Sequence, residues 1–248
     1  MMSSKLPHSI STISRPALLT TMFLLVGLGI IGGFYWQQSI RVNSLQVSGI
    51  WFHEQQDIIE AAQVPIGISP DSLNLEELKN RVQHLAYVKS VHPYVEPGGT
   101  LHISIEERIP IMLLVGGAVE RYADIEGVQL PILKGKSVNV PLVYGFAFAR
   151  QEDTLNTIAF EQIARFLQEA KEHEFSWTTI SEVAFDPVEG VVALSHENGV
   201  KLLFGIESYT NKLANWELFY TQVIRKKGIT HIAQIDLRFN DQIIMRES

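Results

Sequence analysis

The chain of 248 residues contains no cysteine and few charged residues. Without cysteine it cannot form disulfides, thiolate zinc sites or iron–sulfur clusters, and it has no thiol nucleophile. Charged residues make up 19% of the chain, and 27 acids stand against 20 bases, so general binding of nucleic acid is disfavoured. Hydrophobic residues make up 46%, which is enough for a sizeable core and argues against long disordered segments.

Sequence motifs of common catalytic sites are also missing. The chain has no Gly-x-Ser-x-Gly nucleophile motif and no phosphate-binding loop. Glu106 and Glu107 are neighbours on a predicted strand and therefore point to opposite faces, so they cannot act together on one substrate. With Arg108 beside them, we expect surface ion pairs. These observations predict a protein that is not an enzyme.

Residues that could bind a metal or act as acids have simpler explanations. Eight histidines are present, and His92 and His102 lie on adjoining predicted strands, but no third ligand accompanies them. Asp124, Asp186 and Asp236 each lie where a strand gives way to a turn, and turn formation explains their presence. We therefore expect no metal and no other cofactor.

The first 36 residues differ in charge from the rest of the chain. They contain two bases and no acid, which leaves 18 bases and 27 acids in residues 37–248. Residues 17–36 (ALLTTMFLLVGLGIIGGFYW) carry no charge and are long enough, as a helix, to cross a bilayer. A cleaved signal sequence is the alternative, but Phe34, Tyr35 and Trp36 lie where small residues would be needed. The basic amino end is expected to stay in the cytoplasm, with the bulk of the chain outside.

Residues 40–110 show the pattern of a β-α-α-β-β unit. The expected elements are a strand at 40–47, a helix through Ile58 and Ala62, a helix after Asn74, and strands at 88–95 and 100–106. Asn74 and Glu77 have the spacing of a capping box, and Leu78 lies in the apolar stripe of the second helix. Pro93 cannot donate a ladder hydrogen bond, so its strand is expected to have this position at an edge or a bulge.

Residues 111–248 predict a second domain of mostly antiparallel sheet with two helices, so the fold class is α+β. One helix is expected to start at Asp153 or Thr154 and to run toward Glu174, and the other to span about 209–227. Strands are expected at 180–185, 190–195 and 200–204, followed by a last pair at 232–239 and 242–246. No later element is available to cover the last strand, so its outer row of backbone groups is expected to be free for a partner strand.

Several short motifs carry a family resemblance when they are read in order. They are Val47/Ser48/Gly49, Tyr87/Val88, Pro97–Leu101, Glu107–Pro110, Asp124–Gly127, Val140–Gly145, Asn198–Gly205, Lys212/Leu213 and Ile235–Phe239. Together they resemble the FtsQ/DivIB family of bacterial cell-division proteins from about residue 14 to 245. The resemblance implies a cytoplasmic tail at 1–16, a transmembrane helix at 17–36, a POTRA (polypeptide-transport-associated) domain at 40–110 and a distal β domain at 111–248.

The resemblance also implies a function. The chain is expected to be a membrane-anchored scaffold that recruits and holds divisome partners at the septum and so regulates septal peptidoglycan synthesis. Its expected partner is a bitopic coiled-coil protein of the FtsB/FtsL kind, and residues 17–36 would contact lipid of the bacterial inner membrane. Rival interpretations are a POTRA-bearing module of protein export and, less well supported, a membrane-tethered hydrolase.

The expected partner contacts are Arg238, Phe239, Asp241 and Ile243, carried over from the resemblance. Phe239 stands where the family often has tyrosine, so the ring is kept and the hydroxyl donor is lost. Ile244 is expected to carry a backbone donor that a partner strand needs, so proline at this position is expected to prevent binding.

Overall fold

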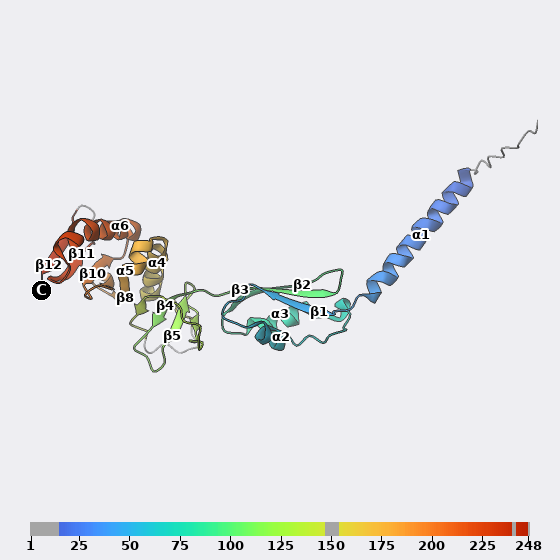
Figure 1. Ribbon diagram of the computed structural model, residues 1–248, viewed down its shortest axis with the longest axis horizontal. Helices are drawn as coiled ribbons and strands as arrows, with labels where there is room; N and C mark the ends of the chain where they lie inside the picture. Colours follow the sequence, from blue (N-terminus) through green and yellow to red (C-terminus); the bar gives the residue numbers. More distant parts are fainter. Residues whose placement is uncertain (1–14, 147–153, 240–241, 248) are drawn as a thin grey trace, which may run out of the picture. The chain divides into compact units, whose positions relative to one another are not determined.

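The structure is a computed structural model that describes residues 15–146, 154–239 and 242–247 (Figure 1). Its chain divides into two compact units. The first contains residues up to Gly49 with 55–82 and 91–105, and the second contains 50–54, 83–90 and the chain from Glu106 onward. The expected domain boundary between residues 110 and 111 stays a prediction.

Helix α1, Arg15–Ser39, contains the uncharged run. Its large apolar side chains between residues 19 and 31 are exposed, from 52% for Val26 to 77% for Phe23. Among the described residues, no helix is both long enough and apolar enough to cross a membrane. The expected membrane span at 17–36 therefore stays a prediction.

The next elements form the β-α-α-β-β arrangement that the sequence predicts. They are β1 (Ser44–Ser48), α2 (Gln55–Ala62), the 3₁₀ turn η1 (Pro70–Ser72), α3 (Leu75–Gln83), β2 (Val88–Val95) and β3 (Thr100–Glu107). The strands lie in the order β1-β3-β2, with β1 parallel to β3. Strand β1 begins at Ser44 and not at residue 40, because the N–H groups of Val42 and Asn43 donate to Ile68 and Gly99 outside the ladder.

Three sequence details of this region are confirmed. The Asn74 side chain accepts a hydrogen bond from the N–H of Glu77 at 3.1 Å, which caps α3. Pro93 lies on β2, which is an edge strand of the three-stranded sheet. Leu78 of α3 is fully buried, as are Leu101 and Ile103 of β3, so the predicted apolar stripe does face the core.

The second unit is built on a nine-stranded sheet. Its strands are β4 (Pro110–Leu114), β5 (Arg121–Asp124), β6 (Gln129–Leu130), β7 (Leu142–Val143), β8 (Ile180–Asp186), β9 (Gly190–Ser195), β10 (Lys201–Gly205), β11 (Ile232–Asp236) and β12 (Ile244–Glu247). They lie in the order β12-β11-β10-β9-β8-β7-β4-β5-β6. The pairs β10–β11, β4–β7 and β7–β8 are parallel and the other pairs are antiparallel. The sheet is thus mixed, with an antiparallel majority.

The helices of the second unit differ in part from the expectation. They are α4 (Ile158–Glu172), α5 (Glu174–Thr179), α6 (Tyr209–Phe219), the π-helix η2 (Tyr220–Ile224) and α7 (Arg225–Lys227). Thr157 caps α4 by accepting from the N–H of Phe160, so the start expected at Thr154 is wrong, and Asp153 lies outside the described residues. The second expected helix is present at 209–227, with a π segment inside it.

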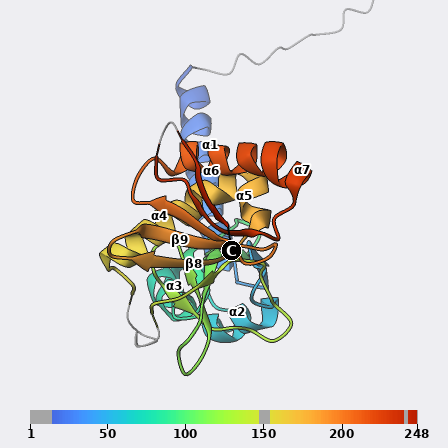
Figure 2. The same cartoon turned by 90° about the vertical axis from the view of Figure 1, so that its left-hand side faces the viewer.

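One face of the nine-stranded sheet is buried under helices. Val183, Ala193, Leu202 and Ile235 lie side by side across four neighbouring strands, and all belong to the main core. Phe166 of α4 and the fully buried Trp216 of α6 belong to the same core. Figure 2 shows α5 and α6 lying over the strands on this side. Burial of this face holds the unit together.

We expect Leu78→Ala to lower the free energy of unfolding by about 2 to 5 kcal/mol, because it leaves a cavity at a fully buried position. Thermal unfolding of the full chain in detergent, followed by circular dichroism, measures the change. Glu76→Ala on the same helix is the control, since its side chain is 72% exposed and its substitution should change stability by less than about 0.5 kcal/mol. Equal melting temperatures for the two variants would contradict the burial of Leu78.

Candidate partner-binding site

Strand β12 forms one edge of the nine-stranded sheet. Among the described strands it pairs only with β11, and all four of its residues are exposed. Ile244 and Met245 are neighbours on this strand, so their apolar side chains lie on opposite faces. Figure 1 shows β12 beside β11 at the carboxyl end of the chain. An open edge of this kind can accept a strand from another chain.

The hydrogen bonds of β11 show which backbone groups of β12 face outward. The N–H of Leu237 donates to Leu203 of β10 at 2.9 Å, and backbone groups alternate sides along a strand. Asp236 therefore faces β12, where it is paired with Ile244. The backbone N–H of Ile244 therefore faces β11, inside the sheet. The expectation that a partner strand needs this donor is wrong. Met245, one residue later, directs its N–H and C=O away from β11.

Three of the four predicted contact residues lie near this edge. Phe239 follows β11 and is 42% exposed. Ile243 precedes β12 and packs, partly buried, against the main core. Arg238 is held by Asp236 through two side-chain hydrogen bonds, Nε to Oδ1 at 2.9 Å and Nη2 to Oδ2 at 2.6 Å. The fourth residue, Asp241, lies outside the described residues.

Buried charges lie beside these residues. The side chain of Lys212 donates to the backbone carbonyls of Phe204 at 2.9 Å and Glu207 at 2.6 Å, and burial lowers its pKa. Burial alone would raise the pKa of Asp236, but the hydrogen bonds from Arg238 outweigh it and hold that pKa below its usual value. The structure thus brings together three separate motifs of the sequence. They are Asn198–Gly205, Lys212/Leu213 and Ile235–Phe239.

Two exposed apolar residues at the same end of the sheet were not predicted. Val188 lies in the turn between β8 and β9 and is 89% exposed, and Ile206 follows β10 and is 56% exposed. Gly190 and Gly205 pair at the ends of their strands, which brings the two segments together. A signal for Val188 was present in the sequence, because an apolar residue after Asp-Pro at a turn has no core within reach.

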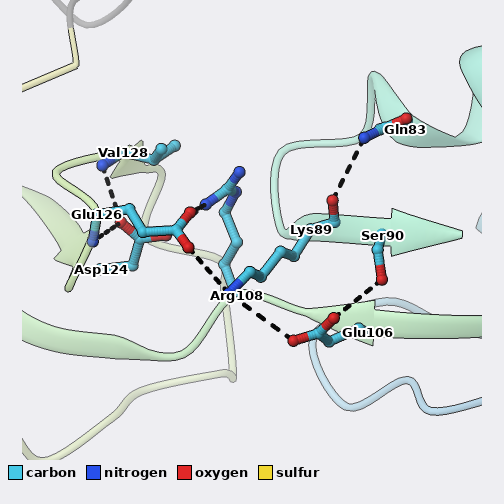
Figure 3. Close-up of polar contacts among 8 residues, drawn as sticks. All are labelled: Gln83, Lys89, Ser90, Glu106, Arg108, Asp124, Glu126 and Val128. Carbon is cyan, nitrogen blue, oxygen red and sulfur yellow. Dashed lines mark hydrogen bonds and ion pairs between the residues drawn. The ribbon is translucent and has the colours of Figure 1, made fainter.

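A second polar cluster surrounds Arg108 (Figure 3). Nη1 of Arg108 lies 2.6 Å from Oδ2 of Asp124 and 2.8 Å from Oε2 of Glu126. The amine of Lys89 lies 2.9 Å from Glu126 and 3.8 Å from Glu106. These residues line a hollow of about 240 Å³. Because the charges compensate one another, we assign this cluster a structural role.

The expectation of a surface ion pair is wrong for Glu107. Its carboxylate is 7% exposed and accepts hydrogen bonds from the backbone N–H groups of Trp51, Phe52 and His53, at 2.6, 2.8 and 3.1 Å. The His53 ring lies 2.8 Å away. Burial raises the pKa of Glu107, but these hydrogen bonds outweigh it, and the net pKa lies below its usual value. Sequence spacing could not show that a loop more than fifty residues away folds around this carboxylate.

The turn interpretation of the three aspartates is confirmed. Asp124 accepts from the N–H groups of Glu126 and Val128, Asp186 from those of Val188 and Glu189, and Asp236 from that of Arg238. Among the described residues, no group of three or more histidines, aspartates or glutamates could hold a metal ion.

The second unit thus combines a mixed sheet, helices over one face and an exposed edge strand, β12. A family model described as "FtsQ/DivIB, C-terminal related" matches residues 109–245, which is more than half of the chain. The chain therefore belongs to the FtsQ/DivIB family.

Curated relatives cover most of the chain. A protein of Rhodothermus marinus named "Cell division protein FtsQ" is 27% identical over 220 residues, covering 86% of this chain and 80% of the relative. Proteins with the same name from Salinibacter ruber and Geotalea daltonii are 25% and 24% identical, and cover 89% and 84% of this chain. The match spans 88% of the Salinibacter protein and 76% of the Geotalea protein.

We expect the hydrogen bonds to Glu107 to stabilise the fold in a pH-dependent manner. Because the folded pKa lies below the ordinary value of 4.5, the stabilisation is present above that pH and is lost as the pH falls toward the folded pKa. Glu107→Gln should lower the free energy of unfolding at pH 7 by about 1 to 3 kcal/mol and flatten its decline below pH 4.5. Denaturant unfolding at several pH values measures both effects.

The exposed Glu120 supplies the control for this measurement. Glu120→Gln should follow the acid dependence of the unchanged protein. If Glu107→Gln gives the same curve as Glu120→Gln, the carboxylate does not stabilise the loop at 51–53.

Proposed function

We propose that this chain is a non-enzymatic, membrane-anchored scaffold of bacterial cell division, which recruits and holds divisome partners at the septum and so regulates septal peptidoglycan synthesis. The printed names of its relatives and its family membership support a role in cell division. They favour this role over protein export and over a tethered hydrolase. The observation that carries the scaffold proposal is the open, fully exposed edge strand β12.

In this proposal, a bitopic coiled-coil partner of the FtsB/FtsL kind adds a strand to β12. The outward-facing N–H and C=O groups of Met245 supply main-chain hydrogen bonds, and the exposed ring of Phe239 supplies apolar contact area. Arg238 offers a charged donor beside it, and Asp241 and Ile243 complete the proposed contacts. Since Phe239 has no hydroxyl group, the ring binds by packing alone.

The proposed anchor is the uncharged run at 17–36 in helix α1. The large apolar side chains between residues 19 and 31 are exposed all around this helix, which is unfavourable in water and suits lipid. The basic residues before the run and the acids after it support a cytoplasmic amino terminus and an extracytoplasmic bulk. The proposed location is the bacterial inner membrane at the division septum.

We expect a fluorescent fusion of the full chain to form a band at midcell in a strain that depends on it. Leu28→Arg should place a charge near the centre of the span, cost about 3 kcal/mol in membrane insertion, and release or degrade the protein. Fluorescence microscopy and membrane fractionation measure the two effects, and Leu28→Ile is the control. Uniform fluorescence of the unchanged fusion would argue against the division role, and a membrane-bound Leu28→Arg variant against the span.

We expect Met245→Pro to abolish partner binding while the chain stays folded. The substitution removes an outward-facing N–H that a partner strand would use, and it leaves the hydrogen bonds between β12 and β11 in place. Co-purification of the full chain with a co-expressed FtsB-type protein of the same cell, in detergent, measures binding. Circular dichroism reports whether each variant is folded.

Matched variants separate backbone from side-chain effects at this edge. Met245→Leu keeps the donor and should bind normally, whereas Ile244→Pro removes a bond to Asp236 and should lower stability as well. Phe239→Ala should weaken binding, and Tyr144→Ala is its control because Tyr144 is 41% exposed on another strand end. Normal binding by folded Met245→Pro and Phe239→Ala variants would refute the edge as the partner site.

A further inference from the structure

Asp236 is a buried carboxylate that accepts hydrogen bonds from Arg238. It is 6% exposed, and its two oxygens accept three hydrogen bonds from Arg238, from the backbone N–H at 3.1 Å, from Nε at 2.9 Å and from Nη2 at 2.6 Å. Arg238 lies two residues after Asp236, just past the end of β11, and the hydrogen bonds bring the two side chains together. A buried acid thus holds one edge of a partly exposed guanidinium in a fixed geometry.

The guanidinium still has donors to offer. Arginine has five side-chain N–H groups, and two of them point to Asp236. Among the described residues, the other three have no hydrogen-bond acceptor, and the Arg238 side chain is 33% exposed. Asp236 lies directly opposite Ile244 of β12, so the acid that holds the guanidinium is one strand away from the open edge.

The surroundings support this fixed geometry from two sides. A Cβ atom added at Gly205 would lie 3.4 Å from Cγ of Arg238 and 3.5 Å from Nζ of Lys212. The φ angle of Gly205 is +74°. These are ordinary contact distances, so space does not require glycine here, but the backbone conformation of Gly205 is one that other residues rarely adopt. Lys212 attracts Asp236 and repels Arg238, while Glu189 attracts Arg238 from the neighbouring turn.

We propose that Asp236 is a positioning residue for partner binding. Its bidentate hydrogen bonds fix the guanidinium of Arg238, so that the free N–H donors of Arg238 meet an oxygen acceptor on the chain that pairs with β12. This inference rests on the proposed function. Asp236 itself does not touch the partner. A long side chain that is already ordered loses less conformational freedom on binding. Loss of the hydrogen bonds from Arg238 to Asp236 therefore weakens binding even though Arg238 is still present.

The test is a double-mutant cycle on the full chain in detergent, with the full-length FtsB-type protein of the same cell as the probe. Asp236→Asn and Arg238→Ala should each raise the Kd, by about tenfold for a contact of this kind. The double variant should bind no more weakly than Arg238→Ala alone, because Asp236 acts only through Arg238. A purely structural role of Asp236 would instead weaken binding by a further factor in the Arg238→Ala background.

A second variant keeps the inference testable if Asp236→Asn does not fold. Arg238→Lys retains the charge at a partly exposed position but cannot form the bidentate pair, so it should bind as weakly as Arg238→Ala. Binding of Arg238→Lys or of folded Asp236→Asn at the level of the unchanged protein would overturn the inference, and so would additive losses in the double variant. If Met245→Pro and Arg238→Ala both bind normally, the proposed function fails as well.

Discussion

Burial of one face of the nine-stranded sheet is the interaction on which the second unit depends. The row Val183, Ala193, Leu202 and Ile235 is covered by α4 and α6, and each apolar side chain removed from water contributes to stability. Met245 of β12 continues this row beside Ile235, yet it is 39% exposed. The cover therefore ends at β11, and the last strand has hydrogen bonds on one side and little packing. This incomplete cover is what makes β12 available to another chain.

The same arrangement of a carboxylate and an arginine occurs at two turns of this unit. At Asp124 and at Asp236, one carboxylate accepts backbone N–H groups of the turn that follows and also binds an arginine at 2.6 Å. Each carboxylate is nearly buried, so an unpaired charge there would be costly, and the arginine supplies the compensating charge. At Asp124 the arginine forms an ion pair with a second acid, Glu126, whereas among the described residues Arg238 forms a close ion pair with Asp236 alone. This difference is why we infer a binding role for Arg238 and a structural one for Arg108.

Local patterns in the sequence predicted many elements of the fold. Strands β2 and β9 have the predicted bounds, the cap of α3 uses Asn74, and the helix at 209–227 ends at Gly228, because alternation, helical spacing and turn residues act within a few neighbouring residues. The start of α4 was missed although its cap by Thr157 is local, and the short helix α5 and the π-helix η2 were not predicted. The burial of Glu107 belongs with them.

The sequence by itself determined the α+β class, the uncharged run at 17–36, and the approximate position of the strand that follows β11. Only the tertiary structure decided that β12 is exposed on both faces, that Met245 and not Ile244 directs its donor outward, and that Asp236 holds Arg238. The reason is physical. Hydropathy and turn propensity are properties of neighbouring residues, whereas strand register and the partners of a buried charge are set by residues brought together from distant parts of the chain.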